Sequence, residues 1–305
     1  IRMKTAVKYC LVTVTTESYS LWTEVMIFSF VKSNVWFDGD IFIISNDLTS
    51  ETKKKYAIFP NIIFKEPTNM LIEKVTNLSN RIPGFKNIGS MFYSLELFDL
   101  TGYKKVLFLD SDMLVTQSIK EVFDFDARFV ASAESCWYAG KGRRTDNYET
   151  VSDYSEPEIF IKNPINSGFM VIDHELVKND NYLGMINMIE PELWSNKLTF
   201  HADQLIINLF LKDRITLSDA RYNYRPTIAA GILQRDGLNF EDAKIIHFYR
   251  QYKPWNFKEV FQLSQHEMVN LRAFKLWYTY FVDYLKFYHL KSKINNLINN
   301  EQAYS

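Results

Sequence analysis

Short apolar runs alternate with amphipathic segments through the first half of the chain. These runs predict strands at Tyr9–Thr15, Asp40–Ile44, Asn61–Phe64 and Lys105–Leu109. Apolar residues spaced three and four apart predict helices between them, over Leu21–Lys32, from the N-cap Thr49 to Ile58, and over Ser90–Leu100. Strands that alternate with helices indicate an α/β fold with a mostly parallel central sheet and helices on both faces.

The second half of the chain is less regular. Its apolar runs predict strands at Arg128–Ala133, Gly168–Asp173 and Lys244–His247, and a helix over Ala202–Leu211. The polar stretch Gly140–Glu158 predicts a long loop. After Trp255 the sequence becomes helical in pattern, aromatic and basic. We therefore expect one α/β domain over residues 3–260 and a helical C-terminal extension over residues 261–305.

Composition narrows the class of protein. Hydrophobic residues make up 47% of the 305 residues and aromatic residues 16%, which supplies a large core and excludes disorder. The 35 Lys and Arg residues balance the 36 Asp and Glu residues, so no nucleic-acid partner is expected. Apolar runs such as Val25–Val31 are shorter than the about 18 residues of a spanning helix. Two distant cysteines favour a reducing, cytoplasmic compartment.

The predicted sheet indicates where ligands bind. Open α/β sheets bind ligands outside the carboxyl ends of their strands. We therefore expect the functional residues just after four strand ends: Thr15, Leu109, Asp173 and His247.

Two carboxylates follow the strand Lys105–Leu109 directly, in the triplet Asp110-Ser111-Asp112. A turn at Ser111 lets both carboxylates converge on one cation, although on a continuing strand they would point to opposite faces. Hard oxygen ligands suit Mn²⁺ or Mg²⁺. The alternative is a strand end whose acids cap the next element.

A second motif follows the strand that ends at His247. An imidazole there is a candidate third ligand beside two carboxylates, and it favours Mn²⁺ over Mg²⁺. Lys253, in the next loop, is a candidate for holding a phosphate. The alternatives are a core histidine and an ordinary surface lysine.

With both motifs in view, the chain resembles glycosyltransferase family 8, the glycogenin-like retaining glycosyltransferases. The resemblance covers Tyr9 to Phe257 and follows the family's order and approximate spacing. It rests on five stretches: Val12–Thr16, Val106–Asp112, Asn166–Val171, Asp203-Gln204, and His247-Phe248 through Lys253-Pro254-Trp255-Asn256. The resemblance implies a GT-A type nucleotide-sugar-binding fold, a UDP-sugar donor and Mn²⁺, with Mg²⁺ as the alternative ion.

The resemblance also implies roles for individual residues. Asp110, Asp112 and His247 match the metal ligands, with Ser111 between the two acids. Thr15 and Tyr19 match the segment that contacts the uracil, although a surface aromatic is the alternative for Tyr19. Lys253 matches the lysine that binds the diphosphate. The residues that match the donor-sugar and acceptor side are Asn166, Asp203 and Gln204.

Two positions depart from the family pattern. Ser94 stands where the family often has Lys or Arg on the helix before the acidic triplet, and Lys86 is a candidate substitute. Arg250 replaces the glycine that follows the metal histidine in glycogenin, and it is a candidate for a charge-assisted contact to the donor.

The implied reaction needs positive charge at the leaving group. A divalent cation stabilises the departing diphosphate as a Lewis acid, and Lys253 adds a second positive charge. Loss of one such electrostatic partner typically costs about 10²–10³ in rate. Retention normally needs a nucleophile on the far face of the sugar, for which Asp203 and Gln204 are the candidates. A same-face substitution is the alternative, as is a purely helix-capping role for Asp203.

Basic and aromatic residues are interleaved in the tail Gln265–Ser305. They either pack onto the main domain or form an interfacial helix on a membrane, as in some bacterial members of the family that act on lipid-linked sugars. Peripheral membrane contact and a homodimer are partner hypotheses that stay open.

Three functions compete. The first is an active Mn²⁺-dependent hexosyltransferase acting on a glycan, lipid-linked or protein acceptor, with the donor sugar open among glucose, galactose and N-acetylglucosamine. The second is a catalytically weak nucleotide-sugar-binding module of the same fold. The third, a nucleotidyltransferase, predicts a Gly-rich basic loop after the first strand, and Thr15-Thr16-Glu17-Ser18 contains no such loop.

Overall fold

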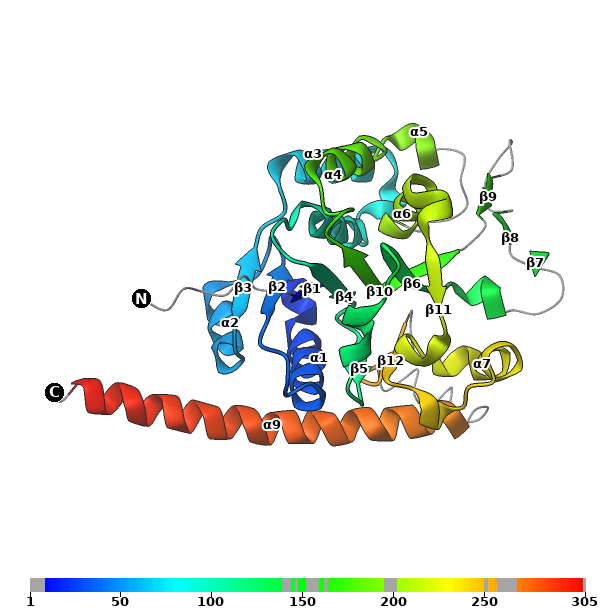
Figure 1. The fold of residues 1–305 in the computed structure, drawn as a ribbon. Helices are drawn as coiled ribbons and strands as arrows, with labels where there is room; N and C mark the ends of the chain where they lie inside the picture. The colour runs from blue at the N-terminus through cyan, green and yellow to red at the C-terminus, as the bar shows by residue number, and fades with distance from the viewer. Residues whose placement is uncertain are drawn as a thin grey trace.

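A seven-stranded sheet forms the centre of the protein (Figure 1). The computed structural model describes residues 9–138, 144–145, 148–151, 159–161, 164–194, 202–249, 252–256 and 268–303. The strands lie in the order β11-β6-β10-β4-β1-β2-β3. Their bounds are β1 Tyr9–Val14, β2 Asp40–Ile44, β3 Ile62–Lys65, β4 Lys105–Leu109, β6 Phe129–Ala133, β10 Ile165–Asp173 and β11 Thr216–Ser218.

One strand of this sheet runs against the others. β10 pairs antiparallel with β4 and β6, whereas the remaining neighbours pair parallel. The prediction of a mostly parallel sheet is confirmed. The expected ligand position after Asp173 is wrong, because Asp173 pairs with Lys105 at the amino end of β4. The opposite end of β10 instead lies beside Asp110, whose backbone N–H donates to the carbonyl of Gly168 over 2.9 Å.

Helices cover both faces of the sheet, as predicted (Figure 1). In β1, Cys10 and Val12 pack into one apolar layer and Leu11 into the other. This explains why the strand is a continuous apolar run. The helices are α1 Ser20–Ser33, α2 Ser50–Lys55, α3 Asn69–Arg81, α4 Asn179–Asn187, α5 Pro191–Trp194, α6 Asp203–Leu211, α7 Ala229–Asp236 and α9 Met268–Ala303.

Some local predictions need correction. Helix α3 was not predicted, although Thr68 caps it by accepting a hydrogen bond from the N–H of Leu71. The helix predicted over Ser90–Leu100 is a 3₁₀ segment, Gly89–Asp99. The predicted loop Gly140–Glu158 lies partly outside the described residues. Its described part contains strands that form a small antiparallel sheet, β7 Arg144–Thr145, β8 Tyr148–Val151 and β9 Ile159–Ile161.

A separate two-stranded sheet joins the two halves of the predicted metal site. β5 (Met113–Val115) pairs antiparallel with β12 (Ile245–His247), with His247 opposite Met113. The last predicted strand therefore exists but lies outside the main sheet. This pairing places His247 beside Asp112, although 134 residues lie between them in the sequence.

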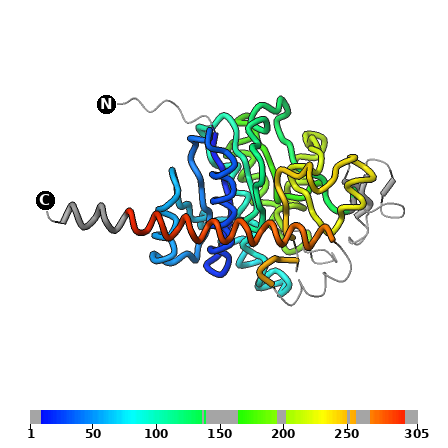
Figure 2. The backbone as a smooth tube through the Cα atoms, turned by 90° about the horizontal axis from the view of Figure 1, so that it is seen from below, coloured from blue at the N-terminus to red at the C-terminus, as the bar shows by residue number. Residues whose placement is uncertain are grey.

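The long helix α9 extends across one side of the molecule and crosses α1, against which it packs (Figures 1 and 2). Its inner side chains Phe274, Trp277 and Tyr284 are buried, and the Tyr284 hydroxyl donates to the carboxylate of Glu24 in α1. The tail thus packs onto the main domain, while the division at residue 260 stays a prediction. None of the helices in the described ranges has the length and apolarity needed to cross a bilayer.

Candidate functional site

A cavity of about 660 Å³ lies beside the carboxyl ends of β1 and β4 and the amino end of β10. Every predicted site residue that the structure describes lines this cavity. These lining residues are Thr15, Tyr19, Asp110, Ser111, Asp112, Asn166, Asp203, Gln204, His247 and Lys253. Arg250, the remaining predicted donor contact, lies outside the described residues.

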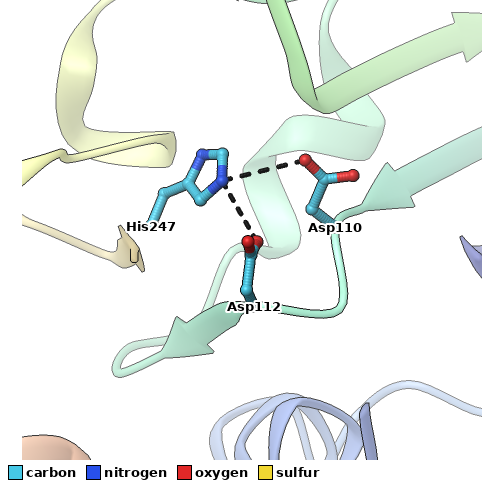
Figure 3. Close-up of side chains that lie close together, drawn as sticks. All are labelled: Asp110, Asp112 and His247. Carbon is cyan, nitrogen blue, oxygen red and sulfur yellow. Dashed lines mark ion pairs between the residues drawn. The ribbon is translucent and has the colours of Figure 1, made fainter. Parts of the chain in front are cut away.

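Asp110, Asp112 and His247 point toward one another from three elements (Figure 3). Asp110 follows β4, Asp112 precedes β5, and His247 ends β12. One ligand atom from each residue lies within 4.8 Å of the others. His247 Nε2 is 3.1 Å from Asp112 Oδ1 and 3.8 Å from Asp110 Oδ2. The turn at Ser111 thus makes the two carboxylates converge.

The pKa values of these three residues shift in different directions. Burial and the neighbouring Asp112 carboxylate raise the pKa of Asp110 well above its ordinary value. Burial alone would also raise the pKa of Asp112, but the Lys253 ammonium and the His247 ring outweigh it and hold that pKa below its usual range. Burial lowers the pKa of His247, which favours the neutral imidazole that binds metals.

The residues fit a divalent cation. Asp112 Oδ1 is buried and accepts no hydrogen bond, so it has a free lone pair facing the other two ligands. A Cβ on Gly168 would lie 2.8 Å from His247 Cε1 and 2.9 Å from Asp110 Oδ2, so the glycine keeps this space open. Two carboxylates and one imidazole form a donor set that suits Mn²⁺, with Mg²⁺ as the harder alternative.

Lys253 lies against the same acidic pair. Its ammonium donates to Asp112 Oδ2 and, over 2.5 Å, to the carbonyl of Phe248. The backbone N–H of Phe248 donates in turn to the carbonyl of Asp112 over 3.1 Å. The loop after β12 is therefore fixed to the turn Asp110–Asp112, and it holds a buried cation beside the three candidate metal ligands.

Glu134 is a cavity residue that the sequence analysis missed. Its Oε2 accepts hydrogen bonds from Asn166 Nδ2 over 3.0 Å and from Gln204 Nε2 over 3.1 Å. Burial would raise the pKa of Glu134, but the Arg225 guanidinium 3.3 Å away and the Ser135 hydrogen bonds lower it to about 2. A signal was present, because Glu134 directly follows the predicted strand Arg128–Ala133.

Asp203 begins α6 at the wall of the cavity, and burial raises the pKa of its carboxyl. The hydroxyl of Ser94 donates to Asp203 Oδ2 over 2.7 Å. Ser94, the first departure from the family pattern, is thus buried against this acid. Lys86, its candidate substitute, is exposed and does not line the cavity.

Aromatic rings support the other end of the cavity. Tyr19 packs edge-on against Trp255, with ring centroids 6.2 Å apart. Trp255 stacks on Trp22 at 4.5 Å and also contacts Trp277 of α9. Thr15 shares a hydrogen bond of 2.7 Å with Thr23, which fixes the loop before Tyr19. The helical extension therefore forms the back of the wall that contains Tyr19.

Comparison with known proteins identifies the family. Residues 10–259 match the family described as Glycosyl transferase family 8. The chain belongs to glycosyltransferase family 8. Galactinol synthase 5 from Arabidopsis thaliana is 22% identical over 220 residues, 67% of this chain and 63% of that protein. The glycosyltransferase GlyF from Streptococcus pneumoniae is 23% identical over 248 residues, 80% of this chain and 54% of that protein.

This family-8 chain therefore spans less than two thirds of the length of these relatives. Solved structures show the same fold. The galactosyltransferase LgtC, in complex with donor and acceptor sugar analogs, has a TM-score of 0.66 at 16% identity, covering 90% of this chain and 95% of its own. GlyE from Streptococcus pneumoniae has a TM-score of 0.62 at 19% identity, covering 92% and 63%. The predicted GT-A type fold is confirmed.

Proposed function

We propose that this chain is a retaining hexosyltransferase that uses a UDP-sugar and Mn²⁺, with a glycan, lipid-linked or protein acceptor. One observation carries the proposal: Asp110, Asp112 and His247 converge in the main cavity of a family-8 chain. A bound divalent ion there would act as a Lewis acid toward the diphosphate leaving group. The same residues would accept Mg²⁺ as the alternative ion.

The chain's own residues divide between the two ends of the donor. Thr15 and Tyr19 would bind the uracil, since Tyr19 lines the cavity and is supported by Trp255. Lys253 would bind the diphosphate beside the metal ligands, because its ammonium already lies against Asp112. Arg250 stays a prediction for the same role.

Asn166, Asp203 and Gln204 would line the sugar. Gln204 Nε2 donates to Glu134 and its Oε1 accepts from the N–H of Ser167 over 3.3 Å, so the amide is held in one orientation. Asp203 Oδ2 is engaged by Ser94. These contacts favour residues that orient the sugar and the acceptor hydroxyl, with a same-face substitution in preference to attack by Asp203.

The test is a panel of UDP-glucose, UDP-galactose and UDP-N-acetylglucosamine, each incubated with the full chain and Mn²⁺. We expect UDP release with at least one donor, and its loss in the isosteric variant Asp112→Asn. No UDP release with any donor, or equal release by the variant, would contradict the proposal. Since the donor sugars differ by one hydroxyl orientation or one substituent, the panel also identifies the sugar.

A second candidate is a binding module with the same fold and weak turnover. The observation that favours it is Ser94, whose neutral hydroxyl donates to the cavity residue Asp203 at a position where the family often has a cation. In the same panel this module would bind UDP-sugars in a Mn²⁺-dependent manner, without UDP release with any acceptor.

Peripheral membrane contact is a further proposal for α9. The outer face of the helix exposes apolar residues beside Lys286 and Lys293: Val282, Leu285, Leu290 and Ile294. Basic and apolar residues on one helix face favour anionic lipid surfaces. We expect salt-dependent binding to anionic liposomes, and we expect the double variant Leu290→Asp/Ile294→Asp to lose it. If the same double variant instead changes the molecular mass of the protein in solution, this face of α9 forms the predicted homodimer. A cytoplasmic location also stays a prediction.

A further inference from the structure

Asn223 lies between the metal ligand His247 and the sugar-side residue Asn166, and it is buried. Its Oδ1 is 2.9 Å from His247 Nδ1. Its Nδ2 donates to Asn166 Oδ1 over 2.8 Å. One side-chain amide therefore connects His247 with Asn166.

The direction of this hydrogen-bond chain is set at Glu134. A carboxylate paired with Arg225 only accepts hydrogen bonds. Asn166 must therefore present its Nδ2 to Glu134, as it does over 3.0 Å. Its Oδ1 then faces away and also accepts from the backbone N–H of Gly168 over 3.3 Å. The orientation of the Asn166 amide is fixed from two sides.

The orientation of the Asn166 amide determines the next two hydrogen bonds, from Asn223 to Asn166 and between Asn223 and His247. Because Asn166 offers only Oδ1, Asn223 must turn its Nδ2 toward it. The Asn223 Oδ1 that remains faces His247, so His247 Nδ1 must be the donor and must carry the proton. In a neutral imidazole, Nε2 then carries the lone pair.

We propose that Asn223 is a positioning residue that holds His247 in the Nδ1–H tautomer, through a chain polarised by the Glu134–Arg225 pair. The inference rests on the proposed metal site. In this tautomer, Nε2 and Asp112 Oδ1 face each other over 3.1 Å with no proton between them, an arrangement that a cation stabilises. In the Nε2–H tautomer, His247 would donate to Asp112 and block the site. Partners that fix the tautomer of a ligating histidine typically affect metal affinity about 10–100-fold.

The first test needs no substitution. The chain has five histidines, so ¹⁵N-histidine NMR of the metal-free full chain resolves few signals, and His247→Gln assigns the relevant pair. We expect a protonated Nδ1 and an unprotonated Nε2 for His247 at neutral pH. A protonated Nε2 would overturn the proposal.

The second test removes the link. Asn223→Ala is expected to lose the Nδ1–H signature and to weaken binding of Mn²⁺ alone by about 10–100-fold, measured from free Mn²⁺ by electron paramagnetic resonance. The matched control is Asn34→Ala, another buried asparagine, which bonds to Phe30 and Ile119 away from the cavity. It should keep both the tautomer and the Mn²⁺ affinity. Unchanged tautomer and affinity in Asn223→Ala would overturn the proposal.

A conservative variant separates positioning from a general structural role. In Asn223→Asp the carboxylate still accepts from His247 Nδ1, so we expect the tautomer to be retained and Mn²⁺ affinity to recover relative to Asn223→Ala. An unprotonated Nδ1 in Asn223→Asp would contradict the proposal. Failure of the proposed function can be distinguished from failure of this inference. If only the proposed function is wrong, the wild-type chain shows the expected tautomer but binds no Mn²⁺. Tight Mn²⁺ binding with a protonated Nε2 would refute the positioning role alone.

Discussion

The hydroxyl of Ser94 donates a hydrogen bond to Asp203 Oδ2 over 2.7 Å at the wall of the cavity. Both residues are buried. Where family 8 often has a cation, this chain therefore places a neutral donor beside Asp203. Without a compensating charge, burial raises the pKa of Asp203 despite the Ser94 bond.

Loss of this bond should destabilise the protein. Ser94→Ala leaves a buried carboxylate with one donor fewer, which typically costs about 1–3 kcal/mol. We expect a lower free energy of unfolding in urea at pH 7. Ser90→Ala, which lies on the same 3₁₀ segment and also lines the cavity, is the control and should change stability less. Equal urea midpoints for wild type and Ser94→Ala would refute this role.

The Glu134–Arg225 pair should appear in the acid stability profile. The pKa of Glu134 falls to about 2 in the folded protein, below the about 4.3 expected when it is unfolded. Its contribution, on the order of 3 kcal/mol, is therefore present above about pH 4.3 and is lost as pH falls toward 2. Unfolding free energy measured from pH 7 to 2.5 should fall less steeply for Glu134→Gln. The exposed control Glu51→Gln should follow the wild type, and parallel profiles for all three would contradict the prediction.

Gly168 should be required for metal binding only because it has no side chain to fill the space between Asp110 and His247. Its added Cβ would lie under 3.0 Å from His247 and Asp110, so Gly168→Ala should displace at least one of these candidate ligands. We expect Mn²⁺ affinity to fall about tenfold or more. In Gly184→Ala the Cβ would meet the ring of Phe210 outside the cavity, and Mn²⁺ affinity should be unchanged. A Gly168→Ala variant with wild-type affinity would place the ion elsewhere.

The attachment of α9 depends on a buried polar contact. The hydroxyl of Tyr284 donates to Glu24, whose pKa is raised by burial. Tyr284→Phe removes a hydrogen bond to a buried carboxyl and should cost about 1.5–3 kcal/mol in unfolding free energy. Tyr288→Phe, one turn further along α9, serves as the control. If the two variants unfold alike, this hydrogen bond does not hold the helix in place.

The positions of most strands along the chain, and that of the acidic triplet Asp110-Ser111-Asp112, could be predicted because they depend on local pattern. Tyr9–Val14 and Lys105–Leu109 are apolar on both faces, which is the signature of a buried strand in such a sheet. The direction of β10 could not be predicted, since a single strand pattern carries no information on its pairing. The ligand position expected at Asp173 was wrong for this reason.

Sequence motifs predicted most of the candidate site residues, whereas the contacts between these residues depend on pairings between distant parts of the chain. Sequence pattern suggested His247 as a ligand, but only the β5–β12 pairing brings it to Asp112. Asn223 and Arg225 lie in a segment without a regular pattern, so their contacts with His247 and Glu134 appear only in the fold. Arg250 lies outside the described residues, and its role stays a prediction.

We propose that Asp110, Asp112 and His247 bind one divalent ion that neutralises the diphosphate of the donor. Calorimetric titration of UDP into the full chain tests it most directly, first with Mn²⁺, then with excess chelator, and then with Asp112→Asn and Mn²⁺. We predict that UDP affinity falls at least about tenfold with chelator and equally in the variant. UDP affinity that is the same in all three titrations would contradict the claim.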